Sequence, residues 1–314
     1  MSDIRVPRAL DAAPLARTTG RSRAFLKLQD GCQHRCAFCI VPLARGPSRS
    51  RPPHVVVDLA QALVTAGHPE ITLTGVDLGH YGADLTPRTS LAALLRELVA
   101  LRGLRWVRLS SILPAYFTPE LLDVVTAAPA IAPHFHVPLQ SGSDRILRRM
   151  RRPYNVAMYR SVVDRMVAAI PAAGLGADVI VGFPGETEAD FQATCRLVEM
   201  LPFTYLHVFT YSDRPGTEAA RLDGHVDAAT MSARSRVLRG LAEAKSAAFR
   251  RMLRGTVQEV VVLETRDRAT GSLVGLSGNY VEVAFEGPDV LMRRVARVRI
   301  TDVDGPRTLG ALAP

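Results

Sequence analysis

Residues 31–42 read Gly-Cys-Gln-His-Arg-Cys-Ala-Phe-Cys-Ile-Val-Pro and directly follow an apolar segment at Ala24–Leu28. Three cysteines in this stretch, Cys32, Cys36 and Cys39, have the spacing C-x3-C-x2-C. The chain has only 4 cysteines in 314 residues. This clustering favours a local metal or redox site over a disulfide framework.

Two kinds of metal site fit this spacing. Three thiolates on one loop can hold three irons of a cubane cluster and leave the fourth iron open for chemistry. A structural zinc site wants four ligands, and His34 is the candidate for the last one. Because His34 lies between two of the cysteines, it is badly placed to close a tetrahedron, so the spacing favours the cluster. Cys195, in the middle of a helical pattern, is expected to be a buried packing residue.

Short apolar segments alternate with helical patterns from residue 24 to residue 211, which is typical of a parallel sheet. The expected strands are Ala24–Leu28, Ile71–Thr74, Trp106–Ser110, His134–Val137, Ala177–Val181 and Leu206–Thr210. The expected helices are Val55–Ala66, Leu91–Leu101, Ala157–Ile170, Glu188–Leu201 and Ala228–Arg254. The pattern therefore predicts an α/β fold, a partial barrel of six βα units over residues 23–254.

After Gly255 the apolar pattern changes to period two. The expected antiparallel strands are Val257–Leu263, Leu273–Leu276, Tyr280–Phe285 and Val295–Ile300. They predict a small β-barrel domain over residues 255–304, followed by a tail at 305–314. At the other end, Met1–Ser22 shows neither periodicity nor a core and is expected to be a linker.

The net charge is +9 and the sequence pI is about 9.9, which suggests an anionic partner such as RNA. Nearly all the positive charge is arginine, so a compositional bias of the genome explains it equally well. No apolar run reaches the roughly 18 residues of a membrane span, and the N-terminus lacks the apolar centre of a signal peptide. A cytoplasmic protein without membrane contact is expected.

Several motifs, in order, resemble those of the methylthiotransferases among the radical S-adenosylmethionine enzymes. They are the cysteine loop with Phe38 before its last cysteine, Arg23–Cys32, Leu43–Arg51, Leu73–Val76, Val137–Asp144, Asp178–Thr187 and Phe209–Thr217. The branch acting on threonylcarbamoyladenosine next to the tRNA anticodon is the best match. The C-terminal β domain resembles the RNA-binding TRAM module.

This resemblance implies that Cys32, Cys36 and Cys39 hold a 4Fe-4S cluster and that Phe38 packs beside it. The open iron binds S-adenosylmethionine, an electron from a donor such as flavodoxin or ferredoxin breaks its carbon–sulfur bond, and the deoxyadenosyl radical abstracts hydrogen from the substrate. No catalytic residue beyond the cluster is assigned.

Functional residues of βα barrels gather at the carboxyl ends of strands. On this ground and by the resemblance, cofactor binding is assigned to Phe38, Gly75, Asp77, Ser110, Ser111, Gln140, Ser141, Asp178 and Gly182. The alternatives are turn glycines, helix caps and, for Asp178, a buried structural acid. Arg149 and Arg152 are candidates for substrate phosphate, against a solvated face as the alternative.

The sequence departs from the family in two places. The full enzymes have an N-terminal domain with three more cysteines and a second 4Fe-4S cluster, the source of the inserted sulfur. That cluster is expected only if such a domain exists. Three interpretations follow. The favoured one is that the sequence is a fragment or has a wrongly chosen start. The others are a natural short form that works with a partner and a barrel that performs other radical chemistry. Leu113 also stands where relatives usually have an acidic residue.

The leading hypothesis is therefore a tRNA methylthiotransferase specific for threonylcarbamoyladenosine. One alternative keeps the chemistry but changes the substrate to another tRNA base or a ribosomal protein. The other alternative is a non-catalytic, metal-stabilised RNA-binding protein.

Overall fold

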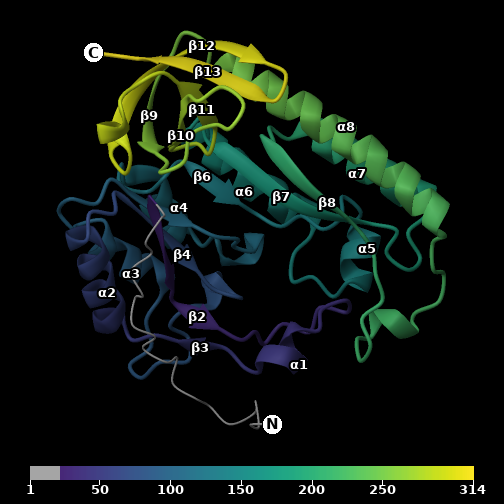
Figure 1. The fold of residues 1–314 in the computed structure, drawn as a ribbon. Helices are drawn as coiled ribbons and strands as arrows, with labels where there is room; N and C mark the ends of the chain where they lie inside the picture. The colour runs from purple at the N-terminus through teal and green to yellow at the C-terminus, as the bar shows by residue number, and fades with distance from the viewer. Residues whose placement is uncertain (1–21) are drawn as a thin grey trace.

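Six parallel strands form the centre of the computed structural model, which describes residues 22–314 (Figure 1). The strands are β1 (Arg23–Lys27), β4 (Glu70–Thr74), β5 (Trp106–Leu109), β6 (His134–His136), β7 (Gly174–Val181) and β8 (Tyr205–Thr210). They form two sheets, β1-β4-β5 and β6-β7-β8, joined near β5 by a single bridge between Val107 and Ile131. Strands β1 and β8 are the outer edges, so the partial barrel predicted from the sequence is confirmed.

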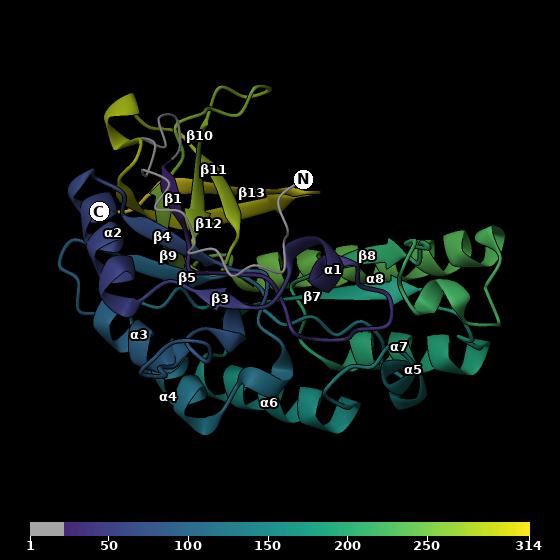
Figure 2. The same cartoon turned by 90° about the horizontal axis from the view of Figure 1, so that it is seen from below.

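Helices cover the outside of this half-barrel, as Figure 2 shows. They are α2 (Pro53–Thr65), α3 (Leu91–Leu98), α4 (Pro119–Ala127), α5 (Asp144–Arg149), α6 (Val156–Ala169), α7 (Glu188–Met200) and α8 (Ala228–Met252), with a short α1 (Val41–Arg45) beside the cysteine loop. Side chains of Ser90, Thr118, Asn155 and Asp227 cap the first turns of α3, α4, α6 and α8. No helix within residues 22–314 is long and apolar enough to cross a membrane.

Side chains alternate between the two faces of each strand. One face packs in the apolar core under the helices, and the other faces the polar interior of the half-barrel, here called the lumen. On β7, Ala177, Val179 and Val181 are fully buried in the main apolar core under the helices. Asp178, between them, points to the opposite face. The lumen side of the sheet therefore carries the polar residues that the core cannot accommodate.

The C-terminal region is a closed barrel of strand order β10-β11-β13-β12-β9. Its strands are β9 (Val257–Val262), β10 (Leu273–Ser277), β11 (Glu282–Phe285), β12 (Val295–Asp304) and β13 (Arg307–Leu312). The expectation of a tail at 305–314 is wrong, because β13 pairs with both β11 and β12 and closes the barrel. Its sequence, Arg-Thr-Leu-Gly-Ala-Leu, has no β-branched apolar run, so period-two patterning did not reveal it.

The half-barrel and the C-terminal barrel contact each other through both polar and apolar side chains. Arg108 of β5 is 2% exposed, forms a two-pronged ion pair with Glu70 at 2.7 and 2.9 Å, and also donates to the carbonyls of Ser277 and Gly278. Trp106 packs against Val261 in a small buried cluster. The turn between β10 and β11 is thereby fixed at one end of the half-barrel.

The linker expected at Met1–Ser22 lies outside the described residues except for Ser22. Short elements complete the fold: the two-residue strands β2 (Gln29–Asp30) and β3 (Arg49–Ser50), and the 3-10 helices Leu78–His80, Pro114–Tyr116, Ala219–Arg221 and Asp289–Leu291.

Candidate functional site

The cysteine loop follows β2 and has a fixed backbone. Gly31 has φ +75°, and a side chain there would place its Cβ 1.9 Å from the carbonyl oxygen of Pro47, so only glycine fits. The Cys32 amide donates to the Gly46 carbonyl at 3.0 Å, and the Cys39 amide donates to the Cys36 carbonyl at 3.1 Å. These contacts hold three half-buried free thiols on one short segment.

Two charged groups flank the thiols. Nη1 of Arg152 lies 3.0 Å from Sγ of Cys36, and a carboxylate oxygen of Asp77 lies 3.8 Å from Sγ of Cys32. Burial raises the pKa of the Cys32 thiol to about 12, so metal binding there would release a proton. Arg152 therefore lies against the cysteine loop, and its candidacy for substrate phosphate stays a prediction.

The donor set fits a 4Fe-4S cluster with one open iron better than zinc. A fourth protein ligand would have to come from His34, but its Nε2 lies 2.8 Å from the Tyr116 hydroxyl and 3.5 Å from Asp77 Oδ2. Burial outweighs the charge of Asp77 and lowers the pKa of His34. With His34 engaged, three thiolates remain, the number that leaves one iron free for a substrate or cofactor.

A cavity of about 300 Å³ opens beside this loop. Its lining includes three residues assigned to the cofactor from the sequence, Phe38, Gln140 and Asp178, together with Ile180 and Phe209. Gln140 has φ 66° and is 8% exposed, and its side-chain oxygen has no hydrogen-bond partner among the described residues. A buried acceptor without a partner at a cavity wall indicates a ligand that donates to it.

Two other assigned positions lie on the cysteine side of the site. The Asp77 amide donates to Gln29 Oε1 at 2.8 Å, and its carboxylate accepts from the Tyr116 hydroxyl at 3.0 Å. A Cβ added to Gly75 would lie 3.0 Å from the same Gln29 oxygen. Gly75 thus leaves room for the Gln29 side chain that fixes this loop.

The remaining positions that were assigned to the cofactor from the sequence differ in exposure and in hydrogen bonding. Ser110 is half-buried, and its Oγ is buried without a hydrogen-bond partner among residues 22–314; Ser111 is exposed to solvent. Ser141 Oγ accepts from the Ser143 amide, so it shapes the turn before α5. The Gly182 amide donates to Glu186 at 2.7 Å, and a Cβ there would lie 2.2 Å from Met231. These contacts fix the turns around Ser141 and Gly182, and their assignment to the cofactor stays a prediction.

Arg149 also contacts protein groups. Its guanidinium donates to the carbonyl of Pro184 at 2.8 Å and pairs with Asp223, and its candidacy for substrate phosphate stays a prediction.

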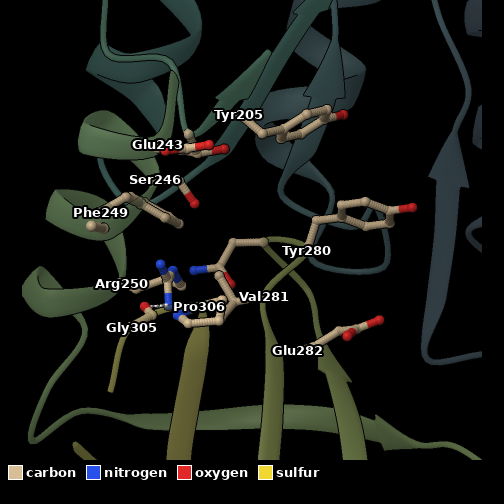
Figure 3. A pocket seen from close by; sticks show the side chains of 13 residues that line it. Tyr205, Glu243, Ser246, Phe249, Arg250, Tyr280, Val281, Glu282, Gly305 and Pro306 are labelled. Carbon is tan, nitrogen blue, oxygen red and sulfur yellow. Dashed lines mark hydrogen bonds between the residues drawn. The ribbon is translucent and has the colours of Figure 1, made fainter. Parts of the chain in front are cut away.

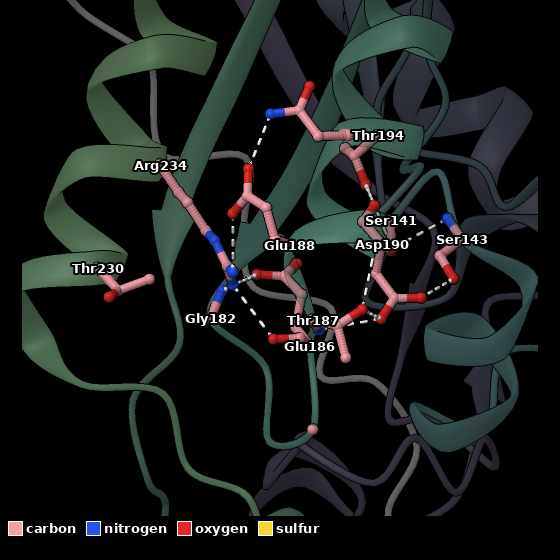
Figure 4. Close-up of polar contacts among 12 residues, drawn as sticks. Ser141, Ser143, Gly182, Glu186, Thr187, Glu188, Asp190, Thr194, Thr230 and Arg234 are labelled. Atoms are coloured by element: carbon pink, nitrogen blue, oxygen red, sulfur yellow. Dashed lines mark hydrogen bonds and ion pairs between the residues drawn. The ribbon is translucent and has the colours of Figure 1, made fainter.

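Figure 4 shows the polar network that fixes the loop after β7. Glu186 is buried and accepts from Arg234 of α8 at 2.8 Å. Thr187 and Asp190 form a reciprocal capping box at the start of α7. Asp190 also accepts from Ser143 at 2.6 Å, which ties α7 to α5. Sequence reasoning missed Arg234 because its partners lie in a distant loop.

A histidine cluster in the lumen was also missed. Asp178 Oδ1 lies 3.1 Å from His136 Nε2 and 3.2 Å from His207 Nδ1. The Tyr205 hydroxyl bonds His136 Nδ1 at 3.0 Å and His134 Nε2 at 2.8 Å. The available signal was polar residues at alternate positions of two strands, beside apolar neighbours.

Burial disfavours the charged form of Asp178, but the hydrogen bonds and charges of His136 and His207 outweigh it and lower its pKa. Burial lowers the pKa of His134 well below its ordinary value, helped by Arg108. The lumen thus carries an ionised carboxylate among imidazoles and a tyrosine.

Comparisons with known proteins identify the family of the chain. The family model described as the radical SAM superfamily matches residues 26–198. The chain is 36% identical over 313 residues to the threonylcarbamoyladenosine tRNA methylthiotransferase of Bacillus subtilis (strain 168), covering 99% of this chain and 69% of that protein. It is 40% identical over 295 residues to the tRNA-2-methylthio-N(6)-dimethylallyladenosine synthase of Parafrankia sp. (strain EAN1pec), covering 91% and 60%.

The fold agrees too. Coproporphyrinogen III oxidase of Escherichia coli, a radical SAM enzyme, superposes with a TM-score of 0.52 at 15% identity, covering 91% of this chain and 68% of that one. The chain covers 69% and 60% of the lengths of the two relatives above, and 52% of the length of the tRNA-2-methylthio-N(6)-dimethylallyladenosine synthase of Leifsonia xyli subsp. xyli (strain CTCB07). The chain belongs to the radical SAM tRNA methylthiotransferase family.

Proposed function

We propose that the chain acts on threonylcarbamoyladenosine beside the anticodon of tRNA. The polar lumen of the half-barrel carries this proposal. The relatives' names give two modified adenosines, one with a threonylcarbamoyl group and one with a dimethylallyl group. The first substituent has a carboxylate, a hydroxyl and N–H groups, whereas the second is a hydrocarbon.

The lumen suits the polar substituent. His207 is exposed there, with 56% of its side chain accessible, and His136 and Tyr205 stand beside it. Burying a hydrocarbon against these groups would cost their hydrogen bonds with water. Phe209, 52% exposed at the same strand edge, offers a flat apolar surface for the adenine ring.

Residues of the cysteine loop and the adjacent cavity would hold the cofactors. Cys32, Cys36 and Cys39 would ligate the cluster, and the guanidinium of Arg152 would receive the carboxylate of S-adenosylmethionine. Gln140 and Asp178 would accept hydrogen bonds from its ribose in the cavity of about 300 Å³. When bound, the cluster and S-adenosylmethionine supply one-electron cleavage of a carbon–sulfur bond and hydrogen abstraction from the substrate.

Sulfur and electrons would come from other groups. The only further cysteine in these 314 residues, Cys195, is 6% exposed within α7, so a second cluster needs cysteines from outside them. A flavodoxin or ferredoxin would deliver the electron.

The test uses protein reconstituted with iron and sulfide without oxygen, a reductant, S-adenosylmethionine and anticodon stem-loop RNAs. The RNAs carry threonylcarbamoyladenosine, dimethylallyladenosine or plain adenosine. We expect release of deoxyadenosine, with the largest stimulation by the threonylcarbamoyl RNA. If the dimethylallyl RNA stimulated deoxyadenosine release most, that RNA would be the substrate. If ribosomes stimulated it most, the substrate would be a ribosomal protein. One equivalent of zinc without iron would instead favour the RNA-binding alternative.

A further inference from the structure

A second, larger cavity of about 680 Å³ lies where α8, the start of β8 and the C-terminal barrel meet (Figure 3). Phe249 and Arg250 of α8 lie on one side of it, and Tyr205 and Tyr280 lie on the other with their hydroxyls pointing away from α8. Its other lining residues are Thr204, Glu243, Ser246, Ala247, Asn279, Val281, Glu282, Gly305 and Pro306. Nothing in the proposed chemistry uses this cavity.

The lining suits a flat, uncharged ring that carries amino groups. Tyr205, Tyr280 and Phe249 are three aromatic rings from three different elements. Both tyrosine rings already stack on His134, so the remaining exposed ring surface, including that of the 42% exposed Tyr280, is what a ligand could stack on. The carboxylates of Glu243 and Glu282 have no ion-pair partner within residues 22–314. Free carboxylates repel a phosphate but accept hydrogen bonds from the amino groups of nucleobases.

The cavity shares a wall with the lumen. Tyr205 lines the cavity, yet its hydroxyl reaches into the lumen and bonds His134 at 2.8 Å and His136 at 3.0 Å. Tyr280 stacks on His134 with ring centroids 4.3 Å apart. One layer of aromatic rings therefore separates the two spaces, so their occupants would be close neighbours.

Tyr280 is held in place before any ligand arrives. It has φ 70°, a backbone conformation unusual for a tyrosine, and its side chain is 42% exposed. The turn is closed by the Ser277 hydroxyl, which accepts from the Val281 amide at 2.9 Å, and anchored by Arg108 on the Gly278 carbonyl at 2.9 Å. Such strain persists where surrounding contacts fix it, often at a binding site.

We propose that this cavity binds an unstacked nucleobase adjacent to the target nucleoside in the same RNA loop. The inference rests on the proposed function, because it takes the RNA substrate as given. It assigns the junction of the two barrels a direct role in positioning the RNA: one base enters the lumen while its neighbour stacks beside Tyr280.

Filling the cavity tests this. Ala247→Trp places a large ring inside it, and Ala244→Trp is the matched control, since Ala244 is exposed on the same helix and does not line the cavity. Binding of the threonylcarbamoyl stem-loop is measured without S-adenosylmethionine, using wild-type RNA and RNAs with one abasic nucleotide next to the target. If Ala247→Trp does not fold, Ser246→Trp replaces it.

Base stacking on aromatic side chains contributes about 1–3 kcal/mol, so we expect Ala247→Trp to weaken binding about 5- to 100-fold and the control to bind normally. The abasic nucleotide should weaken wild-type binding by a similar factor and cause no further loss in Ala247→Trp. Equal binding by both tryptophan variants, or additive losses, would overturn the inference and leave the proposed function intact. Failure of the wild-type chain to bind any stem-loop would count against the proposed function itself.

Discussion

Arg152 places its guanidinium 3.0 Å from the sulfur of Cys36, although the two residues lie 116 positions apart in the sequence. Its Nε donates to the Tyr154 hydroxyl at 2.9 Å, and that hydroxyl donates in turn to the Pro138 carbonyl at 2.9 Å. The cation is therefore fixed beside the cysteine loop, where it can attract the carboxylate of an amino-acid ligand.

Replacing Arg152 by Gln should weaken binding of S-adenosylmethionine by about 10- to 100-fold, because a hydrogen bond to a charged group contributes about 1.5–3 kcal/mol. Equilibrium dialysis with the reconstituted protein measures this, and iron content is measured in parallel. Arg149→Gln is the control, since Arg149 contacts Pro184 and Asp223 instead. Equal affinities for the two variants would show that Arg152 does not hold the cofactor.

Replacing Cys36 by Ala should abolish iron binding after reconstitution, together with all cleavage of S-adenosylmethionine. Two thiolates on this loop are too few to hold a cubane cluster. Iron and sulfide are assayed per chain, with Cys195→Ala as the control because Cys195 is buried in α7. Full iron content in Cys36→Ala would contradict the ligand assignment.

Much of the fold follows from apolar periodicity. All six strands of the half-barrel lie within a few residues of their predicted bounds, and the strands β1, β4, β5 and β7 each bury several apolar residues. Helix α5 was not predicted because it has only 6 residues. Helix α4 has 9 residues but buries only three of them, whereas the predicted α3 buries five of its 8. Strand β13 was not predicted because it is stabilised by pairing with β11 and β12, and this pairing is not visible in its own sequence.

The site was predictable where chemistry and sequence spacing coincide. The cysteines and Phe38 come from one loop, so their proximity is local. The clusters around Asp178 and Arg152 join side chains from distant segments, and single residues such as His207 give no pattern by themselves. Gly182 and Ser141 show why a position at a strand end does not by itself identify a ligand contact, since both also make hydrogen bonds within their own loops.

Replacing His207 by Phe should lower kcat/KM for the threonylcarbamoyl RNA by about 10- to 100-fold, because the polar substituent would lose a hydrogen-bond partner in the lumen. The ratio of kcat/KM for the threonylcarbamoyl RNA to kcat/KM for the dimethylallyl RNA should decrease at the same time. Deoxyadenosine release with each RNA provides the measurement. His54→Phe, a change at an exposed position of α2, is the control. Unchanged discrimination would exclude His207 from substrate selection.

Asp190 makes folding stability depend on pH. Burial disfavours its charged form, but hydrogen bonds from Arg145, Ser143 and Thr187 outweigh burial and lower its pKa. In the acidic range the unfolded chain, with an ordinary pKa near 3.9, binds a proton that the folded chain does not. This stabilisation is thus fully present above about pH 5 and is lost as the pH falls toward the lowered value.

Asp190→Asn should therefore reduce the free energy of unfolding at pH 7 by about 1–3 kcal/mol, because the amide cannot reproduce the charged hydrogen bonds to Arg145 and Thr187. The difference from wild type should shrink as the pH falls below about 4, because Asp190 of the unfolded wild-type chain then binds a proton while the folded chain still holds the carboxylate ionised. Urea unfolding of the metal-free chain at pH 7, 5 and 3.5 measures it. Asp227→Asn at the start of α8, an exposed cap without a cation partner, should show a smaller loss at pH 7. A difference that stays constant from pH 7 to 3.5 would mean that Asp190 stabilises the fold by packing alone.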